Sequence, residues 1–281
     1  MSTSQRSGLN STALALIPLA IAINIASGQL IKVIKLPIYL DSVGTVLAGV
    51  LLGPWVGLIT GLLSNAIWTL IGLDGYALTF APVAGMIGLL AGFAGRLGAF
   101  RVASPRWLSV IIGALFLFAL ALFVLLFVNA TPNPDGSLAF PNAGDLLVQP
   151  VPLVVFLIAA VAGGALGYFG MRTAGYAGLA GVITGVVAAI VSAPIAAYVF
   201  GGVTGSGTDA LVAAFRLSGG NILASAFAQG AVSDPFDKMT SFMVVWAIIQ
   251  ALPQRVRQQF PGLRRAVPAT QPAETTPTRT Q

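Results

Sequence analysis

Asn65 and Trp68 combine an amide with an aromatic ring inside an apolar segment, and their spacing suggests ligand binding. They are three positions apart and so share one face of a helix, and Asp74 and Tyr76 follow shortly after. An aromatic plane beside an amide and a carboxylate suits a pocket for a flat heterocycle. The alternative is that Asn65 bonds a neighbouring helix and that the aromatic residues form an interfacial belt.

A second polar group contains Asp234, Asp237 and Lys238. It first indicates a helix start, because Ser233 or Asp234 can cap a helix and Pro235 suits its first turn. Asp237 then favours the positive end of that helix. Lys238 beside two aspartates also suits a ligand contact or a charge-paired gate, so these three residues are candidate substrate-binding residues.

Residues 201–209 form a glycine-rich stretch ahead of a further helix. Hydroxyl groups in such loops can hold anions at a helix N-terminus. The spacing is not G-x-G-x-x-G and no strand precedes it, which excludes a nucleotide-binding fold. We predict an outer loop that folds over a substrate, with Gly202, Thr204, Gly205 and Gly207 as its candidate residues.

The composition excludes most catalytic chemistry. The chain has no Cys and no His, which removes thiolate nucleophiles, His-based triads and the usual zinc and haem ligands. Its three lysines follow no Walker pattern, so the chain does not hydrolyse ATP in that way by itself. No predicted span holds an acid–base pair or a charge near its centre. We predict a protein that is not an enzyme and has no cofactor and no metal.

The elements that must position these residues are membrane helices. The chain is 57% hydrophobic and only 8% charged, whereas soluble domains are about one quarter charged. Its uncharged runs each exceed the roughly 20 residues that span a bilayer core, and they do not alternate as barrel strands do. We predict an all-α polytopic transmembrane helical bundle. The net charge of +6 could suggest nucleic-acid binding, but the basic residues flank helix ends, as they do in membrane proteins. We therefore expect no nucleic-acid partner.

One run, residues 42–73, exceeds the length of a single span, and the Gly53-Pro54 pair inside it predicts a turn. Splitting it gives about eight spans with both termini inside. The alternative is one unsplit helix, seven spans and an outer N-terminus, and the basic residues fit both arrangements. The predicted spans are about 12–31, 41–52, 55–72, 77–97, 107–128, 149–171, 174–200 and 235–252.

The remaining segments complete this domain organisation. We expect residues 201–233 to form two short helices at the outer face, residues 1–255 to form one transmembrane domain and residues 256–281 to form a disordered cytoplasmic tail. All seven aspartates lie on or near the outer side, Asp41 among them. An acidic outer face suits a cationic, zwitterionic or hydrogen-bonding solute.

Small residues recur at four-residue spacing along several spans, which lets helix backbones approach closely. Internal packing is the main interpretation, and docking of another membrane subunit is the alternative for an outward-facing stripe. The pairs are Ala22/Ala26, Gly57/Gly61, Gly88/Gly92, Gly163/Gly167 and Gly181/Gly185.

Three motifs together resemble a known family: residues 36–68 with their GP-x-x-G turn, FGGVTGSGTD at 200–209 and SDPFDK at 233–238. The chain resembles the substrate-binding S component of energy-coupling factor (ECF) vitamin transporters. The resemblance implies an outward-facing solute pocket closed by two loops, here Lys35–Asp41 and Leu73–Phe80. It also implies docking on a coupling T subunit through an A-x-x-x-A stripe, here Ala22 and Ala26.

The resemblance implies a substrate-binding subunit of an ECF-type importer in a bacterial inner membrane. Such a subunit captures a vitamin-like or nucleoside-like molecule and works with the T subunit and two ATPase subunits. S components usually have a six-helix core, so the hairpin at about 107–171 reads as an addition. The rival functions are a membrane sensor, which the short tail disfavours, and a stand-alone secondary transporter.

Overall fold

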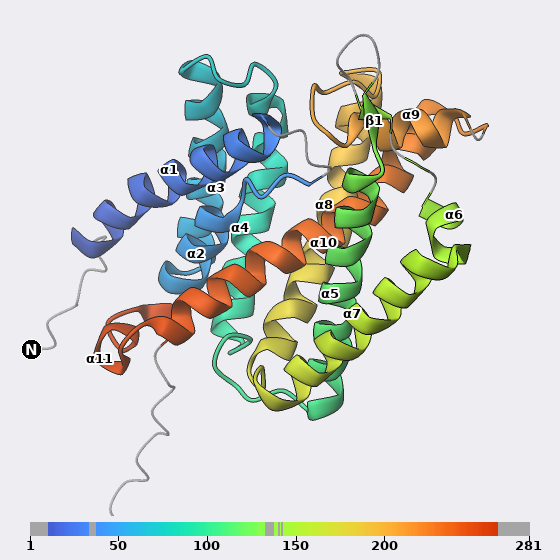
Figure 1. Cartoon of the computed structure of the whole chain (residues 1–281). Helices are drawn as coiled ribbons and strands as arrows, with labels where there is room; N and C mark the ends of the chain where they lie inside the picture. Colours follow the sequence, from blue (N-terminus) through green and yellow to red (C-terminus); the bar gives the residue numbers. More distant parts are fainter. Residues whose placement is uncertain are drawn as a thin grey trace, which may run out of the picture.

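The computed structural model describes residues 11–33, 38–132, 138–139, 141, 143–217 and 219–263. This part of the chain is an all-α bundle with one two-residue strand pair (Figure 1). The helices and strands are α1 (Ser11–Val33), α2 (Val43–Leu52), α3 (Pro54–Leu70), η1 (Ala77–Phe80), α4 (Ala81–Arg96), α5 (Arg106–Val128), β1 (Thr131–Pro132), β2 (Leu138–Ala139), α6 (Ala143–Val148), α7 (Pro150–Phe169), α8 (Ala174–Tyr198), α9 (Asp209–Leu217), α10 (Ile222–Ala251), α11 (Gln254–Arg257) and η2 (Pro261–Leu263).

Five of the described helices are long and apolar enough to cross a membrane, namely α1, α4 together with η1, α5, α7 and α8. This confirms the prediction of a polytopic helical membrane protein. Each predicted span coincides with one α-helix, except that span 235–252 covers only the later part of α10. α2 has 10 residues and is only about 15 Å long at 1.5 Å per residue. It therefore covers about half of a hydrocarbon core of roughly 30 Å.

The chain reverses at Gly53, as the Gly-Pro pair predicts. α2 ends at Leu52, α3 begins at Pro54, and Gly53 between them has a φ of 105°. That conformation is open to glycine at little cost, and Pro54 suits a first helical position because it has no N–H to leave unpaired. The split of residues 42–73 into two helices is confirmed.

Close backbone contacts explain most of the small-residue stripes. A Cβ on Gly57 of α3 would collide with the carbonyl oxygen of Gly88 in α4, and one on Gly88 would collide with that of Gly57. In the same way, Gly181 and Gly185 of α8 lie against the backbone of α10 around Met239. Internal packing is therefore confirmed for these glycines. Ala22 and Ala26 differ, because both are exposed on α1.

α5 and α7 form a hairpin at one edge of the bundle, drawn in green in Figure 1 on the side away from α1 and α3. Gly113 and Gly163 bring their backbones into direct contact. The hairpin reaches α10 through stacked rings of Phe123 and Phe236, whose centroids are 4.6 Å apart. The other long helices pack without it around a core that includes Phe242, which is fully buried.

The two ends of the bundle differ in charge. At one end the loop before α5 meets the loop before α8, where Ser104 N donates to Arg172 O at 2.9 Å. Gln250 of α10 donates there to the Phe100 carbonyl. We call this the arginine end; among described residues it carries Arg96, Arg101, Arg106, Arg172, Arg255 and Arg257. The opposite, acidic end holds Asp41, Asp74, Asp209, Asp234 and Asp237.

α10 corrects two predictions. It runs unbroken from Ile222, and the Asn221 side chain caps it by accepting from Ala224 N. The predicted helix start at Pro235 is therefore wrong, and residues 222–233 are not a separate short helix. The 30-residue helix also places Asp234 and Lys238 near its middle, so the expectation that charges avoid helix centres fails here.

Candidate functional site

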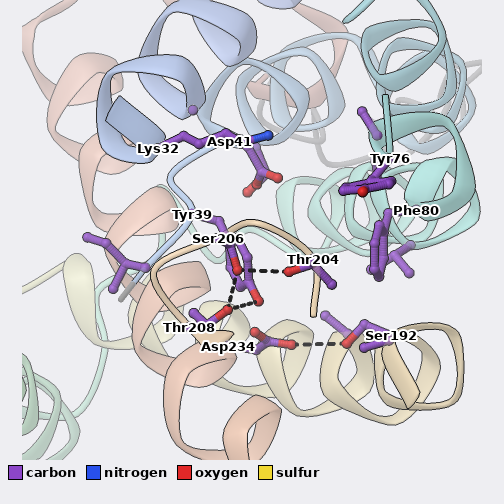
Figure 2. Close-up of a pocket in the computed structure, with 18 of the residues that line it drawn as sticks. Lys32, Tyr39, Asp41, Tyr76, Phe80, Ser192, Thr204, Ser206, Thr208 and Asp234 are labelled. Atoms are coloured by element: carbon purple, nitrogen blue, oxygen red, sulfur yellow. Dashed lines mark hydrogen bonds between the residues drawn. The ribbon is translucent and has the colours of Figure 1, made fainter. Parts of the chain in front are cut away.

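A cavity of about 140 Å³ opens among the helices at the acidic end (Figure 2). One water needs roughly 10–15 Å³ on the same measure, so the space suits a small organic molecule. Its walls come from α1, the loop before α2, α3, η1, α4, α8, the glycine-rich loop after α8, and α10. Segments far apart in the sequence therefore build one recess.

Lys238 joins α10 to the loop that precedes α2. Its ammonium group lies 2.5 Å from Asp237 and 3.2 Å from Asp41, and it donates to the Ser42 hydroxyl at 3.0 Å. Asp237 is fully buried and accepts the backbone N–H groups of Tyr39 and Leu40. Asp237 therefore holds this loop in place from behind the cavity, while Asp41 and Lys238 line it.

A second ion pair lies in the cavity wall between α1 and the loop after α3. Lys32 Nζ is 2.8 Å from Asp74 Oδ2. The other oxygen of Asp74 accepts the Tyr76 N–H at 2.9 Å, and its carbonyl accepts the Thr69 hydroxyl. The pair thus connects the end of α1 to the segment that the resemblance predicts as a closing loop.

A chain of hydroxyl groups fastens the glycine-rich loop over the cavity (Figure 2). Tyr39 Oη lies 2.8 Å from Thr208 Oγ1, which lies 2.6 Å from Ser206 Oγ, which lies 2.9 Å from Thr204 Oγ1. The Asp209 carboxylate closes the loop by accepting the N–H groups of Thr204 and Gly205. The loop is therefore bound to itself and to the loop before α2.

The Tyr39 phenol remains protonated in this network. Its oxygen lies inside the protein, and this burial raises the pKa of the Tyr39 hydroxyl, while the nearby charge of Asp234 raises it further. Both effects act because an extra negative charge is unfavourable in that position. Tyr39 therefore supplies a neutral hydroxyl, which also receives a hydrogen bond from Gln229 at 3.4 Å.

Aromatic rings form another wall. The Phe200 ring lies 4.8 Å from that of Tyr76 and 5.6 Å from that of Phe80, centroid to centroid. Figure 2 shows Tyr76 and Phe80 together on the side of the cavity away from Tyr39. The Trp68 indole also lines the cavity and is 5% exposed. The site therefore offers flat apolar faces.

The two intramembrane asparagines have different roles. Asn24 donates to Thr45 and Ser64 and accepts from the N–H groups of Gly44 and Thr45, so it joins α1, α2 and α3. Asn24 therefore serves interhelical hydrogen bonding. Asn65 lines the cavity and also donates to the Ala77 carbonyl at 2.9 Å.

The cavity brings together most of the residues that the sequence singled out. Among the predicted binding residues, only Asp237 stands behind its wall, and Gly205 of the glycine-rich loop lies outside its lining. Lys35 falls outside the described residues. The predicted residues in the lining are Asp41, Asn65, Trp68, Asp74, Tyr76, Gly202, Thr204, Gly207, Asp234 and Lys238.

Sequence reasoning missed Ser192 and Gln229, which reach the cavity from the C-terminal part of α8 and from α10. No local motif marks either one. Lys32 also lines the cavity, where it pairs with Asp74. The described residues contain no cluster of three or more acidic side chains suited to a metal ion.

Comparison with known proteins adds no assignment to this geometry. The chain matches no protein-family model, and neither the curated proteins nor the solved structures give a match. What is established is therefore a multi-pass helical membrane protein with a recess at its acidic end.

Proposed function

We propose that this chain is the substrate-binding subunit of an ECF-type importer and captures a vitamin-like or nucleoside-like molecule. The observation that carries the proposal is the recess at the acidic end, closed by two segments distant in sequence. The loop before α2 and the glycine-rich loop meet over it through Tyr39 and Thr208. A small recess in which charged, amide and hydroxyl groups converge beside aromatic and aliphatic side chains is typical of ligand sites.

The charge distribution supports an outward-facing recess. Cytoplasmic loops of membrane proteins collect Lys and Arg, and the arginine end carries most basic residues of the described chain. The recess then opens to the exterior of a bacterial inner membrane, where a solute must first be captured.

The exposed stripe on α1 supports a membrane partner. Ala22 and Ala26 are both exposed, and small side chains let a second helix approach closely. We therefore assign this face to the coupling T subunit. Ala22→Leu or Ala26→Leu should abolish co-purification with a T subunit co-expressed with the two ATPase subunits. Ala162→Leu, on an exposed position of α7, is the matched control, and loss of the complex in that variant would contradict the assignment.

Solute capture is tested by mass spectrometry of small molecules that remain bound during purification. A single compound class should be retained by the wild-type chain and lost from Trp68→Ala, which removes an aromatic ring from the cavity wall. Trp107→Ala is the control, because Trp107 is 64% exposed on α5. Retention of nothing, or equal retention in all three proteins, would contradict a binding site at this cavity.

A stand-alone secondary transporter is the second candidate, because α10 carries Asp234, Asp237 and Lys238 within one helix. Ionisable groups inside a membrane helix often mark coupled ion pathways. The compound retained in purification can be loaded outside proteoliposomes that contain this chain alone, with and without a proton gradient. Gradient-driven accumulation would support the transporter and reject the ECF proposal; binding without accumulation would do the reverse.

A further inference from the structure

The cavity wall carries more negative than positive groups. Among the described lining residues there are four carboxylates and two ammonium groups. The carboxylates belong to Asp41, Asp74, Asp209 and Asp234, and the ammonium groups to Lys32 and Lys238.

Both ammonium groups already have partners. Lys32 pairs with Asp74, and Lys238 pairs with Asp41 and with Asp237 behind the wall. The Asp209 carboxylate has no cationic partner in the described chain, but two backbone N–H groups and the Thr204 hydroxyl satisfy it. The carboxylates with protein partners therefore hold the walls of the cavity; they belong to Asp41, Asp74, Asp209 and Asp237.

Asp234 is the exception. Its side chain is in the cavity wall and the residue is 4% exposed, yet within the described chain it has no ion pair. Its carboxylate oxygens accept only the hydroxyls of Ser192 at 3.4 Å and Ser233 at 3.2 Å. A buried carboxylate is costly unless a cation or a proton compensates it. The nearby Lys238 ammonium is paired with Asp41 and Asp237, so a cation that pairs directly with Asp234 would have to come from the cavity.

The aromatic wall of the cavity favours a ligand in which the cationic group is attached to a flat ring. Figure 2 shows Asp234 and Ser192 at one side of the cavity, with Tyr76 and Phe80 on another wall. Aromatic rings attract both flat apolar surfaces and cationic nitrogen atoms. Trp68, also in the lining, adds a further aromatic ring to this wall system.

We infer that the ligand is an organic cation: a flat ring that carries a protonated amine, and this amine pairs with Asp234. This inference rests on the proposed function, because it names the substrate class of the same cavity. Its rival is a proton held permanently by Asp234, with a neutral or anionic ligand in the cavity.

The test uses the purified full chain in lipid nanodiscs and a defined mixture of small ring compounds. Indole, pyridine, pyrimidine and purine rings are each supplied with an aminoalkyl, a hydroxyalkyl and a carboxyalkyl chain. After rapid desalting, bound compounds are quantified by mass spectrometry. We expect an aminoalkyl compound to be retained at least tenfold above the hydroxyalkyl compound with the same ring.

Asp234→Asn should remove this preference, lowering retention of the amine at least tenfold. Asp145→Asn, which removes an exposed carboxylate outside the cavity lining, should retain it. Thermal unfolding checks that both variants are folded. If Asp234→Asn does not fold, the preference of the wild-type protein for aminoalkyl over hydroxyalkyl compounds decides the inference by itself. Preference for hydroxyalkyl or carboxyalkyl compounds, or unchanged amine binding in Asp234→Asn, overturns the inference but not solute capture. Retention of no compound at all contradicts the proposed function together with the inference.

Discussion

The ammonium group of Lys238 lies 3.2 Å from the carboxylate of Asp41, although 197 positions separate the two residues. This contact joins the middle of α10 to the loop that covers the cavity. Lys238 is 5% exposed at its side chain and also neutralises the fully buried Asp237. The same lysine therefore contributes to both the stability of the helix bundle and the position of the loop.

Removal of Lys238 should strongly destabilise the protein. Lys238→Met leaves Asp237 buried without its cation, and loss of one member of a buried pair costs about 3–5 kcal/mol. The more exposed pair of Lys32 with Asp74 should matter less, so Lys32→Met should cost about 1 kcal/mol or less. Thermal unfolding in one detergent compares the two variants. A similar loss of stability in the two variants would show that the ion pairs of Lys238 contribute no more to folding than the pair of Lys32 with Asp74.

Asn24 should be required for folding and dispensable for solute contact. Asn24→Ala leaves four hydrogen-bonding partners unpaired among α1, α2 and α3, at roughly 1–3 kcal/mol for each group that stays buried. The unfolding temperature should fall well below that of Asn129→Ala, where the asparagine is exposed. At temperatures where Asn24→Ala is folded, affinity for the retained compound should equal that of the wild type. A selective loss of affinity would place Asn24 in the site.

The α3–α4 crossing should not tolerate a methyl group. Gly88→Ala drives a Cβ into the carbonyl oxygen of Gly57, which is backbone and can yield only if the helices separate. Overpacking of this kind typically costs 1–3 kcal/mol or more. Gly75→Ala is the matched control, because nothing lies within 4 Å of the added Cβ. Equal unfolding temperatures for the two variants would contradict the close approach of these helices.

Asp209 should determine the order of the glycine-rich loop. Asp209→Asn weakens charge-assisted hydrogen bonds to Thr204 and Gly205, which are worth about 1.5–3 kcal/mol each. Hydrogen–deuterium exchange at residues 202–207 should accelerate by roughly tenfold or more, since 1.4 kcal/mol corresponds to a factor of ten. Asp145→Asn should leave this exchange unchanged. An unaltered loop in Asp209→Asn would show that other contacts hold it.

The sequence by itself determined the membrane helices and the turn at Gly53. Long uncharged runs have only one stable backbone arrangement in lipid, because every N–H and C=O must be paired within the segment. A Gly-Pro pair acts locally, through the φ of Gly53 and the missing N–H of Pro54, so its effect is readable without tertiary contacts. The same is true of Asp41, Asp74 and Asp209, which lie in loops or at a helix start, whereas Asp234 and Asp237 lie within α10.

Only the tertiary structure decided where α10 begins and what lines the cavity. The local pattern favoured a helix start at Pro235, but the helix begins earlier because the Asn221 side chain caps it. Packing along α8, where Gly185 contacts the backbone of Asp234, keeps α10 continuous through Pro235. Ser192 and Gln229 joined the site for a related reason: long-range helix packing sets which side chains face one space. The sequence pattern of a single helix cannot show which of its side chains line the cavity, because the cavity is formed between several helices.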